Sequence, residues 1–81
     1  MLTSEQVRAA RALLRIEQSD LAEQSGVSLA TIKRLETQPG PLAAHAPTVA
    51  AIQRALESAG VIFVPENGEG PGVRLRKGKR R

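Results

Sequence analysis

The stretch from Gln18 to Thr37, QSDLAEQSGVSLATIKRLET, decides the fold of this chain. Its apolar residues are spaced for two short helices, and the sequence Ser25-Gly26-Val27-Ser28 separates them. Gly26 adopts the positive φ that ends a helix at little cost, and Ser28 is a favourable N-cap for the helix that follows. Because the connection is so short, the two helices are predicted to cross at a steep angle, as in a helix-turn-helix.

The second predicted helix has one apolar face and one basic face. Ile32 and Leu35 are expected to point into the core. The opposite face has the spacing i, i+3, i+4 and i+7, and it carries Ala30, Lys33, Arg34 and Thr37. This face contains two cations and no acid, which is typical of a surface that reads DNA.

This region resembles the helix-turn-helix domain of the lambdoid phage repressor and Cro superfamily, also called the xenobiotic-response-element (XRE) family. The resemblance covers residues 7–60 and is carried by Arg11, Gln18, Leu21-Ala22, Gly26-Val27-Ser28, Thr31-Ile32 and Leu35-Glu36. The chain departs from the family at Glu17, where a small polar cap is usual, and it has no counterpart of the fifth helix. The resemblance implies a mainly α fold, a lambda-repressor-like bundle of four helices, here followed by a C-terminal β-hairpin.

The resemblance also implies a transcriptional regulator that binds double-stranded DNA in a sequence-specific manner, most simply a homodimeric repressor on an inverted repeat. The helix from Leu29 to about Glu36 would then enter the major groove. Base contacts are expected from Leu29, Ala30, Lys33 and Arg34, and phosphate contacts from Gln18, Ser28 and Thr31. Leu29 has an alternative place in the core, because it precedes Ile32 by three residues.

Arg11 has two possible roles. In the resembled family the arginine at this place pairs with the acid at the end of the recognition helix, which here is Glu36. The pair would clamp the first helix against the recognition helix. The alternative is an ordinary solvated arginine on a helix surface.

The chain changes character after Gly60. Val61, Ile62, Phe63 and Val64 form a short run of β-branched and aromatic residues, residues 65–72 are rich in turn formers, and Val73-Arg74-Leu75-Arg76 alternates apolar and basic residues. We therefore predict a helical domain over residues 1–60, a β-hairpin over 61–76 and a flexible basic tail over 77–81.

The hairpin is the predicted dimer interface, because the run from Val61 through Ile62 and Phe63 to Val64 is apolar on both faces. Pairing with the same hairpin of a second copy would build a four-stranded sheet and cover the exposed edge. In the rival arrangement the hairpin packs on its own helices, and the dimer forms through the helix that follows Pro47.

Positive charge is concentrated at the C-terminus. Over residues 1–72, eight Asp and Glu outnumber six Lys and Arg, whereas residues 73–81 hold six cations and no acid. Phosphate contacts are expected from Arg74, Arg76, Lys77 and Lys79. The alternative is a tail that only improves solubility.

Other classes of protein are less well supported by the sequence. We expect no enzyme, cofactor or metal, because the chain has no cysteine, a single histidine (His45, in a predicted loop) and no evident nucleophile–base pair. No signal peptide or membrane-spanning run is evident, so a cytoplasmic protein on a bacterial or phage nucleoid is expected. An antitoxin or adaptor that binds a protein partner is the alternative, and only Val61–Val64 offers it an apolar patch.

Overall fold

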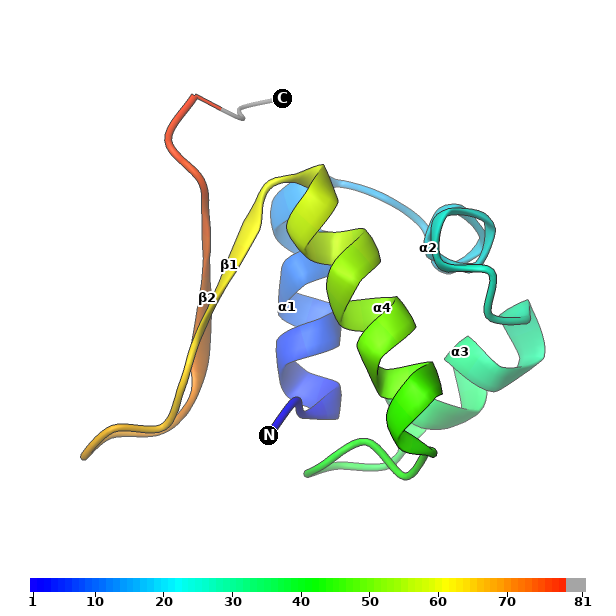
Figure 1. Ribbon diagram of the computed structural model, residues 1–81, viewed down its shortest axis with the longest axis horizontal. Helices are drawn as coiled ribbons and strands as arrows, with labels where there is room; N and C mark the ends of the chain where they lie inside the picture. The colour runs from blue at the N-terminus through cyan, green and yellow to red at the C-terminus, as the bar shows by residue number, and fades with distance from the viewer. Residues whose placement is uncertain (79–81) are drawn as a thin grey trace.

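The structure is a computed structural model and describes residues 1–78. Its helices are α1 (Ser4–Leu14), α2 (Gln18–Ser25), α3 (Leu29–Thr37) and α4 (Ala46–Ala59), and its strands are β1 (Val61–Val64) and β2 (Gly72–Leu75) (Figure 1). The prediction of a mainly α chain with four helices and an antiparallel hairpin is confirmed. Lys79, one of the expected phosphate contacts, lies outside the described residues.

Local sequence explains how α2 and α3 begin and end. Gly26 ends α2 with φ at 77°, a conformation that glycine adopts without strain. The side chain of Ser28 then caps α3 by accepting a hydrogen bond from the amide of Thr31 at 3.2 Å. At the start of α2, the carboxylate of Asp20 accepts from the amide of Glu17 at 2.8 Å, so a backbone donor left free at Glu17 is satisfied from inside the helix.

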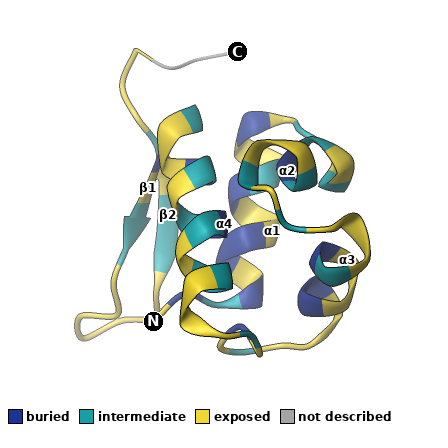
Figure 2. Ribbon diagram, turned by 45° about the vertical axis from the view of Figure 1, so that its right-hand side comes forward, coloured by how far each residue is buried: buried dark blue, intermediate teal, exposed yellow. Residues whose placement is uncertain are grey.

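The elements form three layers, with α1 and α4 in the middle. The hairpin packs on one side of this pair, while α2 and α3 pack on the other side (Figures 1 and 2). The core between the layers is aliphatic and consists of Leu2, Val7, Ala10, Leu14, Leu21, Ile32, Leu35, Leu42, Ile52, Leu56 and Val61. The hairpin and α3 are therefore separated by the middle layer of helices.

The hairpin has an inner and an outer face. In its register Val61 lies opposite Leu75 and Phe63 opposite Val73, and these four side chains pack against the helical core. Val61 is completely buried, so the core of its own chain covers its side chain, and a second copy is not needed to cover it. That Val61 to Val64 form a dimer interface stays a prediction. The hairpin packs on its own helices, as in the rival arrangement.

The outer face of the hairpin carries the remaining side chains. Ile62, with 39% of its surface exposed, lies opposite the exposed Arg74. Of the predicted interface residues, only Ile62 and the half-buried Val64 alternate onto this face. A contact with a second copy through the face of the sheet is therefore restricted to these two positions.

A buried glutamine on α1 joins the hairpin to the helices. The side-chain amide of Gln6 donates to the backbone carbonyl of Gly72 at 3.0 Å and to that of Val64 at 3.5 Å. Its oxygen accepts from the backbone amide of Thr3 at 3.0 Å, while Thr3 caps α1 in return. One side chain therefore caps a helix and holds both strands of the hairpin.

Candidate nucleic-acid interface

The exposed side of α3 holds the predicted base contacts. Ala30, Lys33 and Arg34 are exposed, whereas Ile32 and Leu35 are 1% exposed and face the core. Figure 2 shows this division of α3 between buried and exposed residues. The alternation follows from the helical spacing of its apolar residues.

Leu29 begins α3 and has 37% of its surface exposed. The alternative place for Leu29 in the core is therefore not the one it takes. An exposed leucine beside Ala30 gives the first turn of α3 an apolar end. Such an end is suited to contact with a methyl group.

The two cations of α3 differ in their surroundings. The guanidinium Nη1 of Arg34 lies 3.5 Å from the backbone carbonyl of Ala43, in the segment that joins α3 to α4. Thr31, His45 and Thr48 line the same shallow hollow. This contact places the guanidinium over the end of α3 nearest α4, while Lys33 lies one residue earlier on the exposed face.

Arg11 and Glu36 form a bidentate ion pair. Arg11 donates from Nε to Oε2 of Glu36 and from Nη2 to Oε1, both at 2.7 Å. Its third contact, from Nη1, goes to the carbonyl of Ile16 at 3.1 Å. The Glu36 side chain is 4% exposed and the Arg11 side chain 20% exposed. Hydrogen bonding to Glu36 raises the pKa of Arg11 above its ordinary value, so the guanidinium stays charged.

The ion pair holds three helices together. Arg11 is on α1 and Glu36 near the end of α3, and Gln18, the first residue of α2, donates from Nε2 to Oε1 of Glu36 at 3.0 Å. The backbone carbonyl of Glu36 also accepts from the hydroxyl of Ser4 at 3.2 Å. The buried carboxylate is thus satisfied by charged and neutral donors together, as a buried charge must be.

Gln18 has a neighbour that sequence reasoning missed. The amide nitrogen that is expected to contact a phosphate also donates to Glu36 within the chain. An amide nitrogen carries two hydrogens, so the second remains available for another acceptor. The sequence shows a polar residue at the start of one helix and an acid near the end of the next. It does not show that they are in contact, because this depends on how α2 packs on α3.

Ser28 and Thr31 lie at the start of α3. The hydroxyl of Ser28 is exposed and donates to Oγ1 of Thr31 at 2.9 Å, in addition to capping the helix. Both hydroxyls therefore lie beside the N-terminal end of α3, where helix geometry favours an anion.

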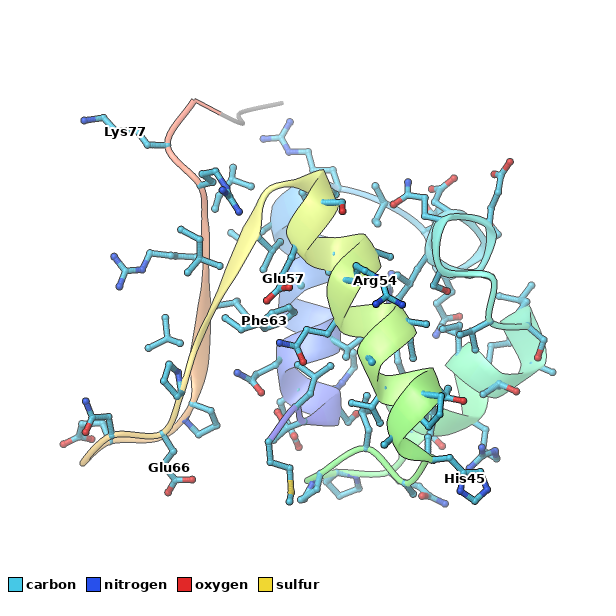
Figure 3. The ribbon with its side chains drawn as sticks, viewed as in Figure 1. His45, Arg54, Glu57, Phe63, Glu66 and Lys77 are labelled. Atoms are coloured by element: carbon cyan, nitrogen blue, oxygen red, sulfur yellow. The ribbon has the colours of Figure 1, made fainter. Side chains whose placement is uncertain are left out.

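The C-terminal cations are not brought together with α3. Arg74 and Arg76 are exposed on the hairpin side of the molecule, and Lys77 follows them. Figure 3 shows Lys77 beyond the end of β2, with the helices between it and α3. These residues and the exposed face of α3 form two separate basic surfaces.

No protein-family model matches this chain, and neither does any curated protein. Within residues 1–78, no helix is both long enough and apolar enough to cross a bilayer. The same residues contain no group of three potential ligands arranged to hold a metal ion.

Proposed function

We propose that this protein is a sequence-specific DNA-binding regulator of transcription, with α2 and α3 as a helix-turn-helix of the XRE type. The observation that carries the proposal is the exposed face of α3. The C-terminal end of this helix is fixed by the ion pair between Arg11 and the buried Glu36. A reading helix must hold its side chains in register with base edges, and a buried bidentate pair restricts its movement.

The side chains on α3 match the chemistry of the major groove. Lys33 and Arg34 offer N–H donors for the N7 and O6 acceptors of guanine, with arginine able to bind both at once. Leu29 and Ala30 offer apolar contact to thymine methyl groups. The face thus combines two kinds of readout within a single helix.

Residues at the N-terminal ends of α2 and α3 would fix the protein on the DNA backbone. Ser28 and Thr31 present hydroxyls at the start of α3, and Gln18 presents a second amide hydrogen at the start of α2. Because Glu36 holds the first hydrogen of this amide, the direction of the second one is set in advance. Glu36 would then position a phosphate contact as well as the helix.

A protein partner is less well supported as the main ligand. Binding of a protein usually needs a contiguous apolar patch. Among the described residues the exposed large apolar side chains are Met1, Leu13, Leu29 and Ile62. They belong to the N-terminus, α1, α3 and β1, so they are distributed over different elements.

Selection of bound sites from random duplex DNA tests the proposed function. A homodimeric repressor should enrich an inverted repeat whose half-sites are about one helical turn, roughly 34–36 Å, apart. Enrichment of a single half-site would indicate that the chain reads DNA as a monomer. Recovery of random sequence would contradict sequence-specific binding.

We expect the dimer to be weakened by Ile62→Lys, because Ile62 is the exposed apolar residue on the outer face of β1. The lysine charge would repel a second copy that meets the chain at β1. Because Ile62 is exposed, the lysine would not disturb the core. Mass in solution by light scattering measures the effect, and circular dichroism measures retained helicity. Phe63 is unsuitable for this test, because it packs against the core of its own chain.

Leu13→Lys is the matched control for Ile62→Lys. Leu13 lies on α1 and is 37% exposed, nearly the same as Ile62 at 39%. This control should leave the dimer intact. A folded dimer that survives Ile62→Lys unchanged would show that the hairpin is not the interface.

A further inference from the structure

We propose that Arg74, Arg76 and Lys77 form a second DNA-binding surface that holds the phosphates of another duplex. We call these three residues the hairpin cations. The inference rests on the proposed function, in which α3 binds the first duplex. The chain would then hold two DNA segments together, one on each side.

The layered fold separates the two basic surfaces. On one side α3 packs on α1 and α2 and exposes Lys33 to solvent. On the other side the hairpin packs on α1 and α4 and turns Arg74 outward (Figure 1). A helix with its side chains is about 10–12 Å thick, and the major groove is about 8.5 Å deep. A duplex seated on α3 therefore does not extend around the middle layer to the hairpin.

The hairpin cations are exposed and not neutralised by neighbours. Among the described residues the ion pairs are those of Arg8 with Glu5 and Arg11 with Glu36, so none of the hairpin cations is paired there. Arg74 and Arg76 share a face of the extended chain, about 6.6 Å apart along it. The sequence adds three more cations directly afterwards, at residues 79–81.

Acidic residues of the hairpin lie at its other end. Glu66 and Glu69 are in the turn between β1 and β2, and Figure 3 shows Glu66 and Lys77 at opposite ends of the hairpin. The hairpin is therefore polarised, with its positive charge at the open end. A polyanion would be attracted to that end alone.

The chemistry of this surface favours duplex DNA over a single strand. Recognition of single strands relies on aromatic side chains that stack on bases, and the one aromatic residue of the chain, Phe63, packs against the core. What remains is contact with phosphates, which is independent of sequence.

A bridging assay tests the inference on the full chain. A short duplex carrying the site selected by the protein is fixed to beads, protein is added, and capture of a second, fluorescent duplex of unrelated sequence is measured. The wild type should capture the second duplex, and capture should fall as salt rises. The variant R74Q/R76Q should bind the fixed duplex as the wild type does and lose capture by about tenfold or more.

The matched control is R8Q/R54Q, which also removes two exposed arginines but leaves the hairpin unchanged. It should capture the second duplex like the wild type, and circular dichroism should show that both variants are folded. Unchanged capture by R74Q/R76Q would overturn the inference. So would a weaker hold on the fixed duplex with a salt slope flattened by about 1.8, because both arginines would then contact the first duplex.

Two further outcomes separate this inference from the proposed function. Fluorescent polyglutamate serves as a second polyanion in the same assay. If the wild type binds the fixed duplex specifically but captures no second duplex, or captures polyglutamate equally well, the second DNA-binding surface is contradicted. The proposed function would not be affected by either result. A wild type that binds no duplex at all would overturn both.

Discussion

Replacing Arg11 with methionine should lower the free energy of unfolding by about 3–5 kcal/mol. Methionine keeps an apolar stem in place of the arginine stem, but it leaves the carboxylate of Glu36, which is 4% exposed, without its counter-charge. A domain of 81 residues has a total stability of roughly 4–12 kcal/mol, so the loss is a large part of the whole. Urea unfolding followed by circular dichroism measures it.

Replacing the other partner of the ion pair, Glu36, should lower the free energy of unfolding by less. Glu36→Gln keeps the size of the side chain and one acceptor oxygen, while Arg11 is 20% exposed and its charge can reach water. We expect a loss of about 1–2 kcal/mol. The double variant Arg11→Met with Glu36→Gln should be more stable than Arg11→Met alone, since it contains no buried unpaired charge.

Arg8→Met is the control for the loss of an arginine from α1. Arg8 is 49% exposed and lies 3.7 Å from Glu5, so its removal should change stability by less than about 1 kcal/mol. Equal losses in Arg11→Met and Arg8→Met would show that the buried pair contributes no more than a surface pair.

Removing Lys33 or Arg34 should each weaken binding to the selected site by about 1–3 kcal/mol and relax one base position. Each side chain is exposed on α3 and offers donors to a base edge. The measurement is the affinity of Lys33→Ala and Arg34→Ala for a set of single-base variants of the site. A lost base contact appears as equal affinity for all four bases at one position.

Arg54→Ala is the control for the loss of a positive charge. Arg54 is exposed on α4 and lies beside Gln24 and Ser25 at the end of α2, so it is not part of the exposed face of α3. It should lower affinity for all the site variants alike, if it lowers affinity at all. If Lys33→Ala and Arg34→Ala keep the base preferences of the wild type, α3 is not the reading helix.

Local sequence was enough to predict the ends of α2 and α3. The φ of Gly26 and the cap at Ser28 are set by residues within one helical turn, so neither depends on the rest of the fold. The direction in which the hairpin packs was harder, because Val61–Val64 is apolar on both faces. The alternation of Val73 and Leu75 with arginine indicates which face of β2 is apolar. The partners of Val73 and Leu75 in the register are the inward residues of β1.

The proposed functional surfaces were predictable in part for a related reason. Helical spacing alone places Lys33 and Arg34 opposite Ile32 and Leu35 on α3. The contact between Gln18 and Glu36 depends on how two helices pack, and the separation of α3 from the hairpin depends on a layer of helices between them. Neither feature is visible in the periodicity of any one segment.

The hydrogen bond from Gln6 to Gly72 has a consequence for the order of folding. It joins residues 66 positions apart, so the bond can form only after the chain has been synthesised through Gly72. Closing so long a loop costs more entropy than the neighbouring contacts among α1–α4. The helices can therefore pack on one another before the hairpin docks on α1 and α4. We expect docking of the hairpin, and with it the final burial of Val61, to be the last step to the native structure.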